Sequence, residues 1–97
     1  TYDEALITLT KKLVNLLIAK HRNYGTQNLI KFGTYGIIIR VSDKIERLIN
    51  LEVNELGDAE ILESITDSWV DIAGYALQAI MMIEGTYELP MKGGEKV

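Results

Sequence analysis

Three acidic residues recur at a regular spacing in one of the most apolar stretches of the chain. Glu63, Asp67 and Asp71 are each four residues apart, so a helix would stack them on one face within about two turns. The apolar residues around them predict that this helix is largely buried. A buried acidic stripe needs positive charge opposite it, which either a metal ion or basic side chains from elsewhere in the chain could supply.

A divalent cation is one candidate for that charge. Mg²⁺ prefers oxygen ligands and often brings substrate phosphates into its coordination shell. Asp43 or Glu46, on a preceding helix, could complete a ligand set with the three carboxylates. Acidic pairs at this spacing are also common on helix surfaces, so the spacing alone leaves a metal site and a structural ion-pair network both open.

Basic residues of the preceding helix are the other candidate. Arg40, Asp43 and Arg47 share one helical face, which Lys44 and Glu46 flank. Either this face is solvated and forms ordinary helical ion pairs, or it meets the acidic stripe. In the second case its cations could also neutralise a phosphate chain.

A third group of residues lies where the first helical segment ends. Lys20 and Arg22 flank the single histidine, His21, and Tyr24 and Gly25 follow directly. Cations and backbone N–H groups meet phosphates, and aromatic rings stack on bases. The stretch from residue 25 to 36 is therefore either a simple connector or an ordered loop that holds a base and a phosphate, with a short turn of helix expected near Gln27 to Lys31.

Composition excludes several classes of function. The formal net charge of −4 argues against sequence-independent nucleic-acid binding and against an anionic membrane surface. The absence of cysteine excludes thiol catalysis, thiolate metal sites and disulfides, and it is compatible with a cytoplasmic location. No apolar run reaches the length of a membrane span. One histidine supports neither a zinc constellation nor a serine triad, and no phosphate-loop motif occurs.

The elements that must position these residues are helical. Apolar residues at steps of three and four predict an all-α chain with three helices, at about residues 2–22, 35–53 and 59–85. A turn is expected at 54–58, with Gly57 ending one helix and Asp58 capping the next. Residues 86–97 form a C-terminal tail of one 97-residue domain. The apolar faces are broad for so short a chain, which predicts a homodimer or homotetramer.

Three blocks of sequence support a family resemblance. They read KHRNYG at 20–25, SDKIERL at 42–48 and ESITDSWVDIAGYA at 63–76. Together they resemble the small phage and bacterial nucleotide modification associated domain proteins. That group in turn is similar to the MazG-like all-α nucleoside triphosphate pyrophosphatases, in which acidic residues on adjacent helices bind Mg²⁺.

The resemblance implies an oligomeric MazG-like helical bundle that binds a nucleotide. It makes Asp43, Glu63, Asp67 and Asp71 the expected metal ligands. Lys44 and Arg47 become phosphate contacts, and Tyr24 with the turn at Gly25 becomes a contact to base or sugar. One departure from the pyrophosphatase pattern concerns the earlier helix, where Lys44 and Arg47 are interleaved with Asp43 and Glu46 in place of E-E-x-x-E.

Two functions of different classes follow. The first is Mg²⁺-dependent hydrolysis of a nucleoside triphosphate, with Glu46 or Asp43 as base and Asp67 essential for turnover. The second is capture of a nucleotide or nucleotide-derived signal without turnover, in which Arg40, Lys44 and Arg47 act as anion receptors. The carboxylate stripe favours hydrolysis, and the mixed charge of the earlier helix favours capture. A structural helical oligomerisation module is the remaining alternative.

Overall fold

The computed structural model describes residues 1–53 and 59–93, which form four helices and contain no strand. These are α1 (Tyr2–Tyr24), α2 (Gln27–Ile30), α3 (Gly33–Val53) and α4 (Ala59–Glu84). The predicted all-α class is confirmed, and the predicted number of helices is corrected from three to four. The extra helix, α2, is the short turn expected near Gln27 to Lys31, and α3 begins two residues before the predicted start. The turn predicted at 54–58 lies outside the described residues.

Helix α1 owes its ends to local chemistry. At its start, the backbone N–H of Glu4 donates to the Thr1 hydroxyl, and the Glu4 carboxylate accepts from the amino terminus, both at 3.2 Å. At its end, Gly25 adopts a φ of 71° and its N–H donates to the His21 carbonyl at 2.9 Å. That left-handed backbone suits glycine, so the helix ends at Tyr24, two residues beyond the predicted end.

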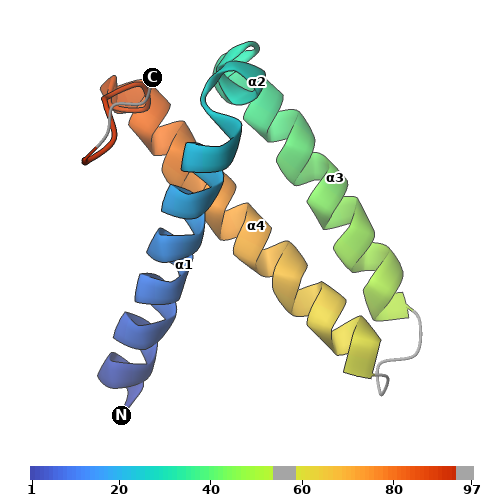
Figure 1. The fold of residues 1–97 in the computed structure, drawn as a ribbon. Helices are drawn as coiled ribbons and strands as arrows, with labels where there is room; N and C mark the ends of the chain where they lie inside the picture. The colour runs from blue at the N-terminus through green and yellow to red at the C-terminus, as the bar shows by residue number, and fades with distance from the viewer. Residues whose placement is uncertain (54–58, 94–97) are drawn as a thin grey trace.

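Helices α3 and α4 run in opposite directions and form a hairpin, and α1 crosses α4 (Figure 1). The α3–α4 pair carries most of the tertiary packing, and the main neighbour of α1 is α4. Gly74 of α4 permits this crossing, because a Cβ atom there would lie 2.9 Å from Leu17 Cδ2. The mid-helix glycine therefore allows a close approach of α1, at a cost of about 1 kcal/mol of helix propensity.

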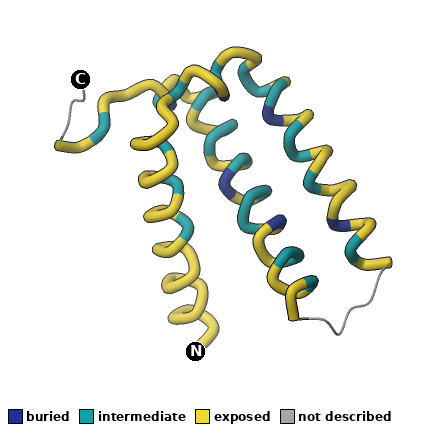
Figure 2. The backbone as a smooth tube through the Cα atoms, turned by 45° about the vertical axis from the view of Figure 1, so that its right-hand side comes forward, coloured by how far each residue is buried: buried dark blue, intermediate teal, exposed yellow. Residues whose placement is uncertain are grey.

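The hydrophobic core is small and lies at one end of the hairpin. Leu29, Ile37 and Tyr87 are buried together, and Val41 and Tyr75 pack against them. Tyr87 belongs to the segment after Gly85, which folds back onto the helices. In α1 no residue is buried, and most of the chain is exposed or intermediate along its length (Figure 2). No helix among the described residues is long and apolar enough to cross a membrane.

Candidate anion-binding site

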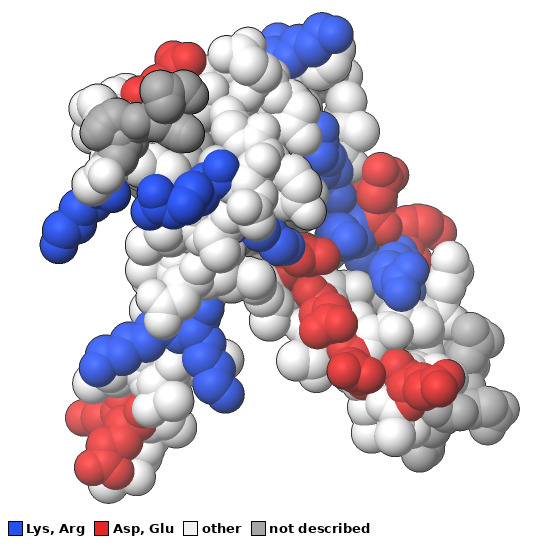
Figure 3. Space-filling model, in the orientation of Figure 1, with Lys and Arg blue, Asp and Glu red and all other residues white. Residues whose placement is uncertain are grey.

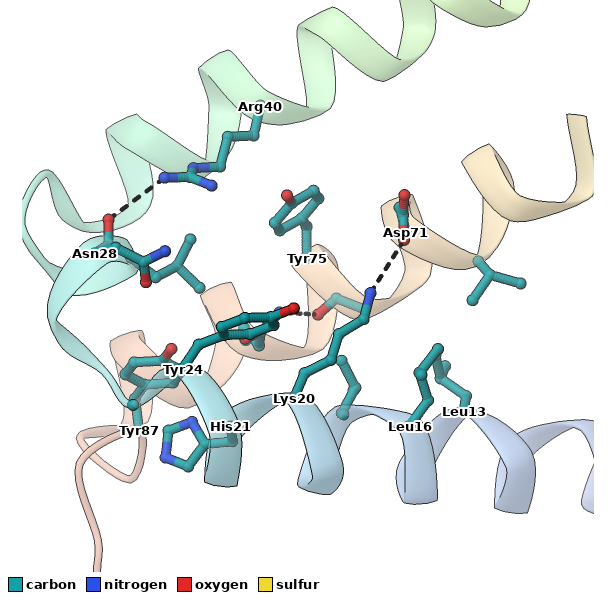
Figure 4. Close-up of a pocket in the computed structure, with 16 residues that line it drawn as sticks. Leu13, Leu16, Lys20, His21, Tyr24, Asn28, Arg40, Asp71, Tyr75 and Tyr87 are labelled. Atoms are coloured by element: carbon teal, nitrogen blue, oxygen red, sulfur yellow. Dashed lines mark hydrogen bonds and ion pairs between the residues drawn. The ribbon is translucent and has the colours of Figure 1, made fainter. Parts of the chain in front are cut away.

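A cavity of about 290 Å³ lies where the end of α1 meets α2, α3 and α4 (Figure 4). Lys20, Tyr24 and Gly25 reach it from the end of α1, and Arg40 reaches it from α3. Asp71 lines it from α4. Three segments separated in sequence therefore bring five of the predicted site residues to one place.

Asp71 is held between two lysines from two different helices. Lys44 Nζ of α3 lies 2.9 Å from Asp71 Oδ2, and Lys20 Nζ of α1 lies 3.6 Å from Asp71 Oδ1. The Asp71 side chain is 26% exposed, so water screens these pairs only partly. At this position the charge opposite the acidic stripe comes from basic side chains.

A second, shallower hollow of about 400 Å³ adjoins the cavity along α3. Arg40 and Tyr75 line both hollows, and Asp43, Lys44 and Arg47 complete the second one. Figure 3 shows Lys and Arg side chains gathered beside α4 and a run of acidic side chains continuing along that helix. The predicted basic face of residues 40–47 thus meets the acidic stripe at its Asp71 end.

Contacts among α1, α2, α3 and the segment after α4 fix another part of the cavity wall. Arg40 Nη2 donates to the Asn28 carbonyl at 3.4 Å, which ties α3 to the short helix α2. The rings of His21 and Tyr87 meet edge to face with centroids 5.2 Å apart. Burial raises the pKa of the Tyr87 hydroxyl above its ordinary value, and the charge of Arg40 partly opposes that rise.

Glu63 and Asp67 are placed differently from Asp71. Both are exposed, and neither forms an ion pair with another described residue. The expected burial of the stripe therefore holds only at its Asp71 end, because α1 covers α4 there and leaves the preceding turns open.

The predicted metal ligands do not converge within one chain. In residues 1–53 and 59–93, no group of three acidic or histidine side chains is close enough to hold a metal ion. The Asp71 carboxylate already faces two ammonium groups, whereas Asp67 and Glu63 lie about one and two helical turns away from it. A cage made only of the four carboxylates does not fit this arrangement, and Mg²⁺ binding stays a prediction.

Four predicted site residues line neither hollow: Glu63 and Asp67, described above, and also Arg22 and Glu46. Arg22 and Glu46 are exposed, so their predicted roles as ligand contact and catalytic base stay predictions. The structure adds Tyr75, Gln78 and Tyr87 to the cavity wall. Tyr75 and Gln78 follow Asp71 at four and seven residues, so helical spacing could have identified them. Tyr87 lies outside any periodic pattern and carried no such signal.

Comparison of the chain with protein-family models, with curated proteins and with solved structures gives no match. The resemblance to the nucleotide modification associated domain proteins therefore rests on the three sequence blocks. The residues of these blocks do meet in space, since Lys20, Lys44 and Asp71 come from one block each and form the two ion pairs.

Proposed function

We propose that this protein binds a phosphorylated nucleotide in the cavity and the adjoining hollow. The observation that carries the proposal is a local excess of positive charge on an acidic chain. Lys20, Arg40, Lys44 and Arg47 line the two hollows together with only two carboxylates, Asp43 and Asp71. The whole chain has a net charge of −4, so this concentration of cations indicates an anionic ligand.

The two hollows suit different parts of a nucleotide. The arginines of α3 can form paired hydrogen bonds with phosphate oxygens, which is the geometry that a guanidinium favours. Tyr24 is exposed and lies at the rim of the cavity, where its ring can stack on a base. The volume of about 290 Å³ is at the small end for ligand pockets. The phosphates would therefore extend into the hollow along α3.

Ligand phosphate would compete with Asp71 for the two lysines. Lys20 and Lys44 are held in place by that carboxylate in the free protein, so they need little reordering to meet a phosphate. The same carboxylate offsets only one of the positive charges of the free site, so the excess of cations remains. Capture of the ligand without chemistry, as in a sequestering protein for a nucleotide or nucleotide-derived immune signal, needs only these groups.

A second candidate function is Mg²⁺-dependent hydrolysis of a nucleoside triphosphate. It is favoured by Glu63 and Asp67, which continue the line of Asp71 and carry no ion pair among the described residues. Mg²⁺ is commonly held by one or two carboxylates plus substrate phosphates, and these two residues could hold it in that way. When bound, the metal would polarise the phosphoryl oxygens.

The proposal includes a homo-oligomeric state, a dimer or tetramer, in the cytoplasm, which is the host cytoplasm if the chain is phage-encoded. The oligomer is supported by the large hydrophobic side chains that one chain leaves exposed on α1, α3 and α4. The cytoplasmic location is supported by the family resemblance and by the cysteine-free composition.

The test is a thermal-shift screen of nucleotides and of cyclic or linked nucleotides, with and without Mg²⁺, followed by chromatography of each hit after incubation. A ligand at about 100 times its Kd should stabilise the fold by about 2.7 kcal/mol. Recovery of the intact ligand supports capture, and Mg²⁺-dependent conversion to a monophosphate supports hydrolysis. Asp67→Asn should then abolish conversion and leave binding intact. If no nucleotide shifts the melting temperature, the binding proposal fails and a structural oligomerisation module becomes the better explanation.

A further inference from the structure

An exposed stripe of mostly apolar residues runs the length of α4. Its members alternate at steps of four and three, which is the spacing of a helix seam that packs against another helix. Every one of them is exposed in the single chain, and Trp69 is 54% and Ile83 77% exposed. The α4 stripe consists of Leu62, Thr66, Trp69, Ala73, Ala76, Ile80 and Ile83.

Helix α3 carries a matching stripe. Its members recur at steps of three and four over four turns, and all are exposed and uncharged. The α3 stripe consists of Tyr35, Ile38, Ser42, Ile45 and Ile49. Two adjacent helices therefore each present a seam that nothing in the described chain covers.

The two stripes lie on the same face of the hairpin. Successive residues of a helix are about 100° apart. On α4, Trp69 follows the buried Ser68, and on α3, Ile49 follows the buried Leu48. Because the helices are antiparallel, a step of one residue toward the C-terminus turns to the same side of the helix pair on both α3 and α4. Asp67 and Arg47, which precede those buried residues, point to the opposite side, where α1 and the cavity lie.

The accessible surface of the chain is large for its mass. The accessible surface is 7348 Å², whereas a folded monomer of this mass should expose about 5,600 Å². The radius of gyration is 15.3 Å, against about 12.5 Å for a compact domain of this length. The excess of about 1,800 Å² belongs to the whole chain, including α1, where Leu6, Leu9 and Ile18 are exposed as well. In size it lies within the roughly 1,000–2,500 Å² that each chain buries in an obligate dimer.

We propose that this face of the α3–α4 hairpin packs against the same face of a second copy about a two-fold axis. The result is a four-helix arrangement with the two stripes of each chain inside. A second copy fits because it supplies seams of equal length and equal lack of charge, and a two-fold contact uses up the surface on both chains. Ala73 and Ala76, between the larger Trp69 and Ile80, let the facing helices come close.

This inference rests on the oligomeric part of the proposed function and is independent of nucleotide binding. It adds that the cavities stay open in the dimer, because they occupy the face opposite the interface. Each dimer should therefore hold two independent ligand sites on its outer surfaces.

The test is the solution mass of the full chain and of two matched variants, measured by light scattering with chromatography. Ala73→Glu places a charge in the α4 stripe, and Ala19→Glu places the same charge on an exposed alanine on the polar side of α1. We expect the native protein and the Ala19→Glu variant to form assemblies with an even number of chains. Ala73→Glu should weaken association at least about 100-fold, since a charge in a well-packed interface centre costs more than most substitutions.

A second measurement covers the case in which Ala73→Glu does not fold. The chain has no native cysteine, so Ala76→Cys and Ala19→Cys each add a single thiol. A short bismaleimide should join two Ala76→Cys chains and leave Ala19→Cys chains single. Native-like association of Ala73→Glu, together with no link through residue 76, would assign the oligomer to another surface. A monomeric native chain would overturn both this interface and the proposed oligomer, whatever the nucleotide screen shows.

Discussion

The two faces of the α3–α4 hairpin differ in what they leave unsatisfied. The face toward α1 carries charges of both signs, and its contacts are made within the chain through Lys20, Lys44 and Asp71. The opposite face carries almost no charge, and its apolar side chains are exposed. The same two helices thus present one side on which Asp71 is paired within the chain and one on which apolar side chains are exposed. The difference separates the proposed ligand site from the proposed dimer surface, so we expect that each can be altered without the other.

The largest effect is expected from removing arginines of α3 on the side of the hairpin that faces α1. Arg40→Gln with Arg47→Gln should weaken nucleotide binding by about 100-fold or more, because each charge-assisted hydrogen bond contributes about 1.5–3 kcal/mol. Titration of the nucleotide by calorimetry measures the change. Lys12→Gln, on an exposed part of α1, is the control and should bind normally. If the double variant also loses its oligomeric state, the two faces are not independent.

Gly74 tests how the charged face depends on α1. Gly74→Val should destabilise the fold by about 1–3 kcal/mol through overpacking, since even a Cβ would lie 2.9 Å from Leu17 Cδ2. It should also weaken ligand binding by moving Lys20 and Tyr24. Gly74→Ala is the milder partner, because the flexible end of Leu17 can shift and alanine favours the helix. Urea unfolding measures the stability of the two variants. Equal stability for valine and alanine would mean that α1 does not dock as described.

The lysines around Asp71 should contribute little to stability. Lys44→Met should lower the free energy of unfolding by at most about 1 kcal/mol, and Lys20→Met by less, because these pairs are partly exposed and the second is longer. Urea unfolding at low and high salt measures the difference. If either variant lowered the free energy of unfolding by several kcal/mol, the main role of these lysines would be to stabilise the fold, and the proposed role in ligand binding would be secondary.

The smallest effect is expected in the pH dependence of the free energy of unfolding, to which the Tyr87 hydroxyl contributes. Its pKa is raised in the folded state, so its contribution to stability is complete below about pH 10 and is lost as the pH rises through its folded pKa. Tyr87→Phe should therefore lose less stability than the native chain between about pH 9.5 and 11. Thermal unfolding across this range measures it, and identical slopes for the two chains would contradict the assignment.

Periodicity in the sequence predicted the helices well because helix formation is local. The capping residues of α1 and the glycine at its end act within a turn, and both ends lie near the predicted places. The pairing of Asp71 with Lys44 was one of two options, because spacing cannot say which charge arrives from another segment. That α1 covers Asp71 but not Glu63 depends on the close approach of α1 at Gly74, and local spacing does not predict which helix packs against a mid-helix glycine.

The burial of Tyr87 was not predictable, because a lone aromatic residue after a helix has no periodic neighbours. The apolar surface was predicted as a quantity but not as a location. Its division between the α3 and α4 stripes became visible only once the buried residues on each helix showed which side faced the other.

Helix α4 packs on α3, is crossed by α1 and, in the proposed dimer, meets a second chain. A change on any of its sides would need a compensating change in a different segment. Among chains that descend from one ancestor, α4 should therefore diverge most slowly, and its substitutions should occur together with substitutions in α1 or α3. The polar side of α1, which no other segment restrains, should be where such lineages differ most.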